Sequence, residues 1–399
     1  MSTDLASSRS ARRAPAHRPD SGRRPQRRTR IAVIGAGWVS REVWVPLLAA
    51  HDAFQVTAVV DPNREAAVEA APDQRTTRVL ARPEEVDRAV ADAAIIALPN
   101  HLHLPVASAL LGRDIPVFVE KPVCRTLMEA QELALAGLAR HEGQAPVARL
   151  LAWSAARHRG DVRRLEELVP SLGELRRVGL TWSRAAGIPQ RTGWFTDRRL
   201  AGGGALLDLG WHLLDVGMHL LGWPQMVHAT GMLSADWMGR PDATADWSRR
   251  AGGVPAGGSG QPVEDTAHGL LVTDTGVGIW LETRWASHQP HDVTTITVEG
   301  TEGVATLRAT FGFSPHRVER SSLTVLRRGR EELVPLPSEP VGVEYRRQVD
   351  VLARLLCDPA GGQATGSMPE VLSIAAAIDQ IYSSARTSVP ADRTKGAVR

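Results

Sequence analysis

The fold of this 399-residue chain is decided by Ile31-Ala32-Val33-Ile34-Gly35-Ala36-Gly37-Trp38-Val39-Ser40. Four apolar residues predict a buried strand, the two glycines predict a tight turn, and a helix-like run continues to about Ala50. Such a turn lets the backbone approach a pyrophosphate, whose charge the free amides of the helix N-terminus stabilise. Ser40 takes the third small position, where Gly or Ala is usual. The stretch therefore predicts a dinucleotide-binding strand, turn and helix.

A second predicted strand, from Gln55 to Val60, ends at Asp61, 24 residues after Gly37. A carboxylate at this place accepts hydrogen bonds from the ribose hydroxyls of adenosine. It also repels a 2′-phosphate, which favours NAD over NADP as the cofactor. Arg64 is the residue that could instead turn toward a phosphate, so NADP is the alternative.

Short apolar strands continue to alternate with helical patterns beyond Asp61. Strands are predicted at 93–98 and 116–119, with helical stretches around 84–91 and 101–111. This alternation predicts an α/β fold with a doubly wound parallel sheet. Pro99 and Lys121 then follow the carboxyl ends of strands, which is the edge where such sheets bind ligands.

Lys121 also stands out by composition. The chain has 47 lysines and arginines, and only Lys121 and Lys395 are lysines. Arginine stays protonated, whereas burial or neighbouring charge can tune an ammonium until it exchanges protons near neutral pH. Because Lys395 belongs to a polar C-terminal segment, Lys121 is the candidate for a catalytic lysine.

Four motifs, in this order, resemble those of the Gfo/Idh/MocA oxidoreductases. They are the glycine turn, the run Leu98-Pro99-Asn100-His101-Leu102-His103, the turn Glu120-Lys121-Pro122, and residues 202–215, which read GGGALLDLGWHLLD. The resemblance extends from about Arg30 to Ser384. It implies an N-terminal Rossmann domain and a C-terminal α+β domain whose open, mainly antiparallel sheet forms one wall of the active cleft. Most members oxidise or reduce one hydroxyl of a sugar, cyclitol or related polyol.

The expected organisation has four parts. They are a disordered basic tail (1–30), a dinucleotide-binding Rossmann domain (31–146), a substrate-binding and oligomerisation domain (147–386), and a polar C-terminal tail (387–399). The first 30 residues hold nine arginines against two aspartates, a net charge of +7, so the rest of the chain carries −4. Family members commonly pair their open sheet faces, which implies a homodimer or homotetramer.

The resemblance assigns catalysis to Lys121, Asp208 and His212. The last two are four residues apart, which places both on one helical face. Oxidation of a hydroxyl needs a base for its proton while hydride leaves for the nicotinamide. Either Lys121 or His212 could be that base, and His212 is favoured because an imidazole titrates nearer neutral pH. The cofactor residues carried over from the family are Gly35, Gly37, Trp38, Val39, Asp61, Pro99, Asn100, His103, Glu120 and Lys121.

Tryptophans suggest where a sugar binds. Of eleven, nine lie between Trp153 and Trp285, in the expected substrate domain. Indole faces stack on the C–H faces of sugars, although core packing explains most of them equally well. Residues 150–158 depart from the family pattern, so the substrate groups that this segment contacts are not inferred. Asp215 and His219 are expected to be structural. The substrate candidates are Arg157, Trp182, Arg184, Trp194, Trp211 and Trp285.

The remaining composition excludes several classes of protein. Only Cys124 and Cys357 are present, too few for a disulfide framework, and no membrane span or signal peptide is recognisable, which together favour a cytoplasmic protein. His101 and His103 have no compact ligand spacing with later histidines, so no metal site is expected. Nucleic-acid binding through the basic tail would be unspecific, and we expect none.

Together these features predict an NAD-dependent dehydrogenase that oxidises a secondary hydroxyl of a sugar or aminocyclitol glycoside to a ketone. An aminoglycoside intermediate or a nucleotide sugar would fit. Arginine-rich, lysine-poor usage suggests a high-GC bacterium, and hence a role in antibiotic biosynthesis. The alternatives are a sugar ketoreductase, an NAD-dependent enzyme that cleaves glycosides, and a non-catalytic regulator that senses dinucleotides.

Overall fold

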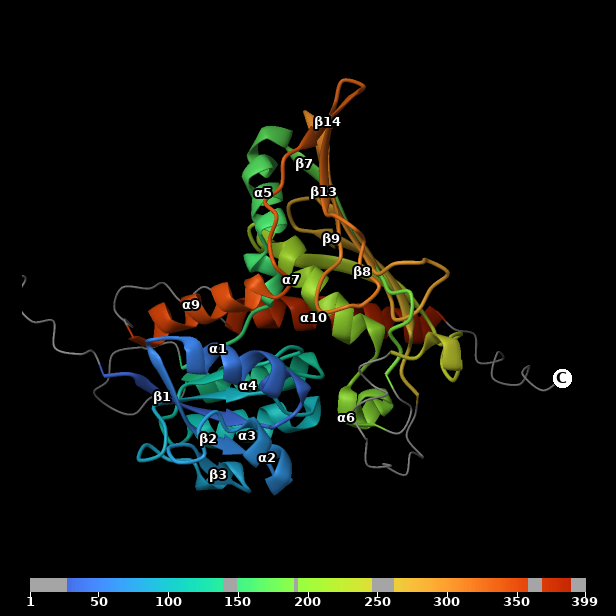
Figure 1. Cartoon of the computed structure of the whole chain (residues 1–399). Helices are drawn as coiled ribbons and strands as arrows, with labels where there is room; N and C mark the ends of the chain where they lie inside the picture. Colours follow the sequence, from blue (N-terminus) through green and yellow to red (C-terminus); the bar gives the residue numbers. More distant parts are fainter. Residues whose placement is uncertain (1–26, 139–148, 190–192, 246–261, 358–367, 389–399) are drawn as a thin grey trace, which may run out of the picture.

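The structure, a computed structural model, describes residues 27–138, 149–189, 193–245, 262–357 and 368–388. Two sheets dominate it (Figure 1). The N-terminal domain is drawn in blue and teal, the second sheet stands beyond it, and helices α9 (Val343–Cys357) and α10 (Met368–Ser388) cross the junction. The expected boundary between the two domains at 146–147 falls outside the described residues and stays a prediction.

The first sheet is parallel, in the order β3-β2-β1-β4-β5-β6, and confirms the doubly wound α/β fold. Its central strands are apolar and buried on both faces, as a sheet covered by helices requires. The strands are β1 (Thr29–Ile34), β2 (Phe54–Val60), β3 (Arg78–Leu80), β4 (Ala93–Ile96), β5 (Val117–Val119) and β6 (Leu150–Leu151). The helices are α1 (Val45–Ala50), α2 (Arg64–Ala70), α3 (His103–Leu111) and α4 (Leu127–Leu138).

The helix predicted at 84–91 is wrong. A 3₁₀ turn covers Pro83–Glu85, and turns occupy the following residues. The Asp87 carboxylate accepts from the amides of Ala89 and Val90, so a local turn competes with the helix. The short edge strand β3 was also missed, because its three residues lack an apolar pattern.

The start of β1 lies two residues before the predicted strand. Arg27 and Arg30 both bind the carboxylate of Asp92, at 2.7 and 2.8 Å, and extend the ordered chain into the region assigned to the basic tail. Residues 1–26 and 389–399, which hold most of the two expected tails, lie outside the described residues.

The second sheet has the order β14-β13-β12-β11-β7-β10-β9-β8. Only β7 and β10 pair in parallel, which confirms the mainly antiparallel sheet. Strands β8, β13 and β14 and helix α5 were not predicted. The elements are α5 (Gly160–Leu168), β7 (Leu175–Ser183), α6 (Arg198–Ala201), α7 (Trp211–Leu220), β8 (Met226–Ser234), β9 (Thr266–Thr273), β10 (Gly278–Arg284), β11 (Val293–Gly300), β12 (Gly303–Ala309), β13 (Ser322–Arg327) and β14 (Arg330–Val334).

The two faces of this sheet differ. Helices α7 and α10 pack on one face, where Leu180, Leu281 and Ile296 are fully buried. The other face has large apolar side chains in register across neighbouring strands, such as Leu270 beside Trp280. We call it the open sheet face, and its exposed apolar residues are Met232, Leu270, Trp280, Leu326 and Leu333.

A buried ion network ties α7 and α10 to the segment that follows β6. Arg157 lies in a 3₁₀ turn, Ala155–His158, and bonds the Asp215 carboxylate through two nitrogens at 2.5 and 2.6 Å. The same guanidinium binds Glu370 at 2.7 Å and lies over the ring of Trp223. Since Asp215 is 1% exposed, its charge depends on this partner.

Replacing Arg157 with Ala leaves Asp215 buried without a cation. We expect the free energy of unfolding to fall by about 3–5 kcal/mol, measured by chemical denaturation followed by tryptophan fluorescence. Arg164→Ala, which breaks the exposed pair with Glu167, is the matched control and should cost less than about 1 kcal/mol. Equal losses in the two variants would show that the network does not hold these helices.

Candidate active site

The helix that carries Asp208 and His212 starts from a tight glycine turn. A Cβ at Gly203 would lie 1.9 Å from the Tyr382 hydroxyl, and one at Gly204 would lie 1.9 Å from the Glu264 carbonyl oxygen. The Glu264 carboxylate accepts from the Gly204 and Leu206 amides and from the Tyr382 hydroxyl, at 2.8–3.1 Å. These contacts fix the start of a π-helical turn, Leu206–Gly210, which continues as α7.

The structure brings Lys121 and Asp208 together across the domain boundary. Lys121 Nζ donates to Asp208 Oδ1 at 2.8 Å, and Trp285 Nε1 donates to Oδ2 at 2.9 Å. Burial alone would raise the pKa of Asp208, but Lys121, the nearby charge of Arg184 and these two hydrogen bonds hold that pKa well below its usual value. Asp208 is therefore an anion at any working pH, and Lys121 and Trp285 both donate to it.

His212 completes the group from the next helical turn. Its Nδ1 lies 2.5 Å from Ser154 Oγ, and its ring lies 5.6 Å from that of Trp182. Burial lowers the pKa of His212 well below its usual value, and the charges of Lys121 and Arg184 lower it further against the opposing effect of Asp208. The imidazole is therefore neutral at neutral pH.

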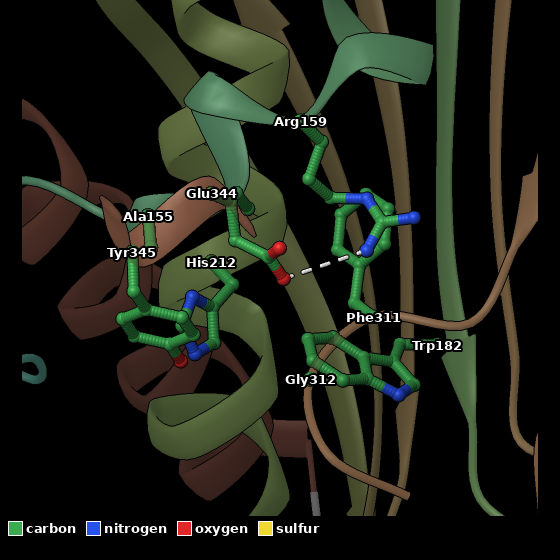
Figure 2. Close-up of a pocket in the computed structure, with 9 residues that line it drawn as sticks. Ala155, Arg159, Trp182, His212, Phe311, Gly312, Glu344 and Tyr345 are labelled. Atoms are coloured by element: carbon green, nitrogen blue, oxygen red, sulfur yellow. Dashed lines mark ion pairs between the residues drawn. The ribbon is translucent and has the colours of Figure 1, made fainter. Parts of the chain in front are cut away.

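A pocket opens beside His212 (Figure 2). Trp182 and Phe311 form an apolar wall, while Glu344 and Arg159, paired at 3.6 Å, supply charge. Tyr345 completes the lining from the N-terminal end of α9 and stacks on Phe313. Such a mixture of ring faces and fixed polar groups suits a sugar.

Sequence reasoning missed Ser154, Arg159, Phe311, Glu344 and Tyr345 because no motif surrounds them. One signal was available for Tyr345. The chain has only two tyrosines, and both lie near this site: Tyr345 lines the pocket and Tyr382 holds Glu264. The scarcity that pointed to Lys121 also marks this residue.

The glycine turn fits a dinucleotide. Gly35 has φ +100°, and a Cβ there would lie 2.3 Å from the Ala97 carbonyl oxygen. At Gly37 no described atom comes within 4 Å of an added Cβ, so the backbone is open to a ligand on that side. Asp61 ends β2 beside this turn, where its carboxylate accepts from the amides of Ala36 and Asn63 at 2.8 Å. This geometry fits the phosphate cradle of a dinucleotide site. Contact of the Asp61 carboxylate with the ribose stays a prediction.

The other predicted cofactor residues lie near this turn or at the adjacent strand ends. Trp38, next to Val39 in the turn, is 43% exposed and contacts Phe313 edge-on. Glu120 accepts from Trp44 Nε1 at 2.7 Å and from the Lys121 amide.

Two predicted cofactor residues have structural partners. Asn100 follows Pro99 at the end of β4 and donates to the Ala201 carbonyl, a contact between the two domains. Buried His103 bridges the carbonyls of Leu98 and Pro122, at 2.8 and 3.0 Å. Contact of either residue with the cofactor stays a prediction.

Among the substrate candidates, Trp182 lines the pocket, and Arg184 lies over the Trp182 ring at 5.4 Å. Trp285 is fully buried and acts through Asp208, while Trp194 packs on Phe195. The structure does not bring the other two candidates, Arg157 and Trp211, to the site around Asp208 and His212. Arg157 is held in its ion network, and Trp211 is 1% exposed in the core.

Within the described residues, no group of three or more His, Cys, Asp or Glu side chains could hold a metal ion. None of the helices in the same residues has the length and apolarity needed to span a membrane.

Comparison with known proteins agrees with this geometry. Residues 29–145 match the oxidoreductase family with an NAD-binding Rossmann fold, and residues 162–306 match the GFO/IDH/MocA C-terminal domain. A protein of Amycolatopsis mediterranei, provisionally named a UDP-kanosamine synthase oxidoreductase subunit, is 45% identical over 374 residues, 92% of this chain and 98% of that one. The chain therefore belongs to the Gfo/Idh/MocA family and is an NAD-binding oxidoreductase.

The chain is also similar to a sugar reductase and to a crystal structure from antibiotic biosynthesis. The dTDP-3,4-didehydro-2,6-dideoxy-alpha-D-glucose 3-reductase of Streptomyces antibioticus is 29% identical over 315 residues, 79% of this chain and 85% of that one. The crystal structure of GenD2 from gentamicin A biosynthesis, in complex with NAD, superposes with a TM-score of 0.70 at 21% identity, covering 93% and 97% of the two chains. That structure shows the fold.

Asp61 is expected to select the cofactor. Asp61→Ala should reduce the preference for NAD over NADP, measured as the ratio of kcat/KM values, by about tenfold or more, or about 1.4 kcal/mol. The substitution also removes the hydrogen bond from Ala36, but this loss weakens the binding of NAD and NADP alike. The ratio therefore reports the ribose contact alone. Asp73→Ala, at an exposed aspartate beyond α2, should leave the ratio unchanged. An unaltered ratio in Asp61→Ala would show that this carboxylate does not reach the ribose.

Proposed function

We propose that this enzyme uses NAD to oxidise a secondary ring hydroxyl of a nucleotide sugar to a ketone, ahead of transamination in antibiotic biosynthesis. The observation that carries this proposal is the convergence of Lys121, Asp208 and His212 beside a pocket, at the strand edge that also bears the glycine turn. The names of the relatives support it. Kanosamine is an amino sugar, and an amine replaces a hydroxyl most directly through a ketone. The reductase of Streptomyces antibioticus suggests carbon 3 as the reacting position.

Charge at the pocket favours a nucleotide sugar over an aminoglycoside. No described carboxylate lies within ion-pair distance of Arg184, whereas Arg159 and Lys121 are both paired. Arg184 is near enough to Asp208 and His212 to lower both their pKa values. An unpaired guanidinium suits the diphosphate of a nucleotide sugar and repels the ammonium groups of an aminoglycoside. The charge of Arg184 has more effect at the pocket than the net negative charge of the chain beyond its basic tail, because salt screens distant charges.

The residues divide the chemistry between them. NAD, when bound, supplies the acceptor for the hydride that leaves the carbinol carbon. In this proposal Lys121 bonds the reacting oxygen, and Asp208, 2.8 Å from Nζ, stabilises the ammonium form. His212 is neutral at working pH, so one ring nitrogen carries a proton and the other accepts. Because hydride transfer is reversible, the same residues would serve a ketoreductase, which is the second candidate.

The reaction is tested by mixing the enzyme with NAD and a panel of UDP-sugars, dTDP-sugars, cyclitols and aminoglycosides. We expect NADH absorbance and a two-hydrogen mass loss with a nucleotide sugar, and none with the aminoglycosides. Product without accumulating NADH would favour a glycoside-cleaving enzyme that recycles its cofactor. Silence across the whole panel would contradict the oxidative assignment and favour the reductase or the regulator.

Variants provide the control for this assay. Lys121→Ala and His212→Ala should each lower turnover by about a hundredfold while NAD affinity is kept. His219→Ala, on the solvent side of the same helix, should be neutral because its partner is the half-exposed Glu166. Loss of NAD binding in the first two variants would contradict the proposed division of roles.

We further propose that two copies pair through the open sheet face, whose apolar residues are exposed in the single chain. Wild-type protein should sediment as a dimer or tetramer at micromolar concentration, and Trp280→Arg should shift it toward the monomer. Leu135→Arg, at an exposed apolar residue on α4, is the matched control and should not. A monomeric wild type would refute the pairing.

A further inference from the structure

Ser154 is the one described residue that hydrogen-bonds to the imidazole of His212. It comes from the segment after β6 that departs from the family pattern, and it is fully buried. Its hydroxyl caps the 3₁₀ turn Ala155–His158 by accepting from the Ala156 amide at 3.2 Å. The oxygen of Ser154 is therefore fixed by its own backbone before it meets the imidazole.

A count of donors and acceptors decides the direction of the contact. The Ala156 amide can only donate, so it takes one lone pair of Ser154 Oγ. The remaining Ser154 proton needs an acceptor, and His212 Nδ1 is the one within reach in the described part of the chain. If His212 donated from Nδ1 instead, the buried hydroxyl proton would stay unpaired, at a cost of about 1–3 kcal/mol. The favoured arrangement is therefore Ser154 O–H donating to Nδ1.

The other ring nitrogen follows from this bond. A neutral imidazole has one proton, and with Nδ1 accepting, that proton is on Nε2. No described residue hydrogen-bonds to Nε2, and His212 lines the pocket (Figure 2). We infer that Ser154 is a positioning residue that holds His212 in the tautomer whose Nε2–H donates a hydrogen bond to the reacting oxygen of the substrate. This inference rests on the proposed function, because it assigns roles within the same reaction.

The proton balance then changes from that expected from the sequence. For oxidation, the Lys121 ammonium first gives its proton to water. The O–H bond of the substrate then breaks, its proton goes to the Lys121 amine, and bound NAD would accept the hydride. Asp208, 2.8 Å away, stabilises the ammonium that results. His212 keeps its proton and stabilises the charge that develops on the oxygen. In reduction the same ammonium returns the proton.

The decisive experiment compares His212→Gln with His212→Ala. A glutamine amide can donate near the position of Nε2 but cannot accept a proton, so it distinguishes a donor from a base. We expect His212→Gln to stay within about tenfold of wild-type kcat while His212→Ala falls about a hundredfold. If Gln and Ala are equally inactive, His212 is the base and the inference fails.

Nuclear magnetic resonance of the NAD-bound enzyme, labelled with ¹⁵N-histidine, reads the tautomer directly and needs no substrate. The His212 signals, assigned by their loss in His212→Ala, should show an unprotonated Nδ1 in wild type and in Ser154→Thr, and a mixture in Ser154→Ala. A protonated Nδ1 in wild type would overturn the inference. Because this readout is independent of the substrate panel, failure of the proposed reaction and failure of the tautomer assignment are distinguishable.

Discussion

The ion pair between Lys121 and Asp208 is the contact on which the rest of the site depends. Lys121 lies two residues after strand β5 of the first domain, and Asp208 lies in the π-helical turn Leu206–Gly210 of the second. The pair therefore joins the two domains at the candidate active site. Two charges removed from water are stable together only when further hydrogen bonds satisfy their remaining lone pairs and protons. Trp285 supplies that second bond to Asp208 from a fully buried position.

The surrounding structure fixes both partners in place. Glu264 and Tyr382 hold the glycine turn from which the Asp208 helix begins. On the other side, Asn100 donates across the domain boundary to Ala201. Since these contacts come from segments far apart in the chain, the geometry of the site is a property of the complete fold, and rigid neighbours keep it from relaxing.

The sequence predicts the parts of this molecule that follow local rules. The glycine turn, the strand ends at Asp61 and Lys121, and the spacing of Asp208 and His212 all carry a pattern within a few residues. Strands β13 and β14 were missed because both mix polar and apolar residues, and β8 was missed although its length is ordinary. The helix predicted at 84–91 does not form, because the Asp87 carboxylate accepts from the backbone amide two residues later.

The residues around the pocket could not be predicted in the same way. Ser154 hydrogen-bonds to His212 from 58 positions away, and Tyr345 lines the same pocket from 133 positions away. Neither residue has a motif of its own. Arg157 illustrates the opposite error. An arginine near the expected cleft resembles a ligand-binding residue in sequence, but a buried carboxylate opposite it gives it a structural task.

Three aromatic rings connect the glycine turn with the pocket. Trp38, beside Gly37, contacts Phe313, and Phe313 stacks on Tyr345, which lines the pocket next to His212. The glycine turn and the pocket beside His212 therefore share a wall of aromatic rings. Thermodynamic linkage imposes a symmetry on such a wall: by whatever factor bound nucleotide alters the affinity for sugar, bound sugar alters the affinity for nucleotide by the same factor. A change in the packing of these three rings that alters this factor therefore alters it equally for both ligands.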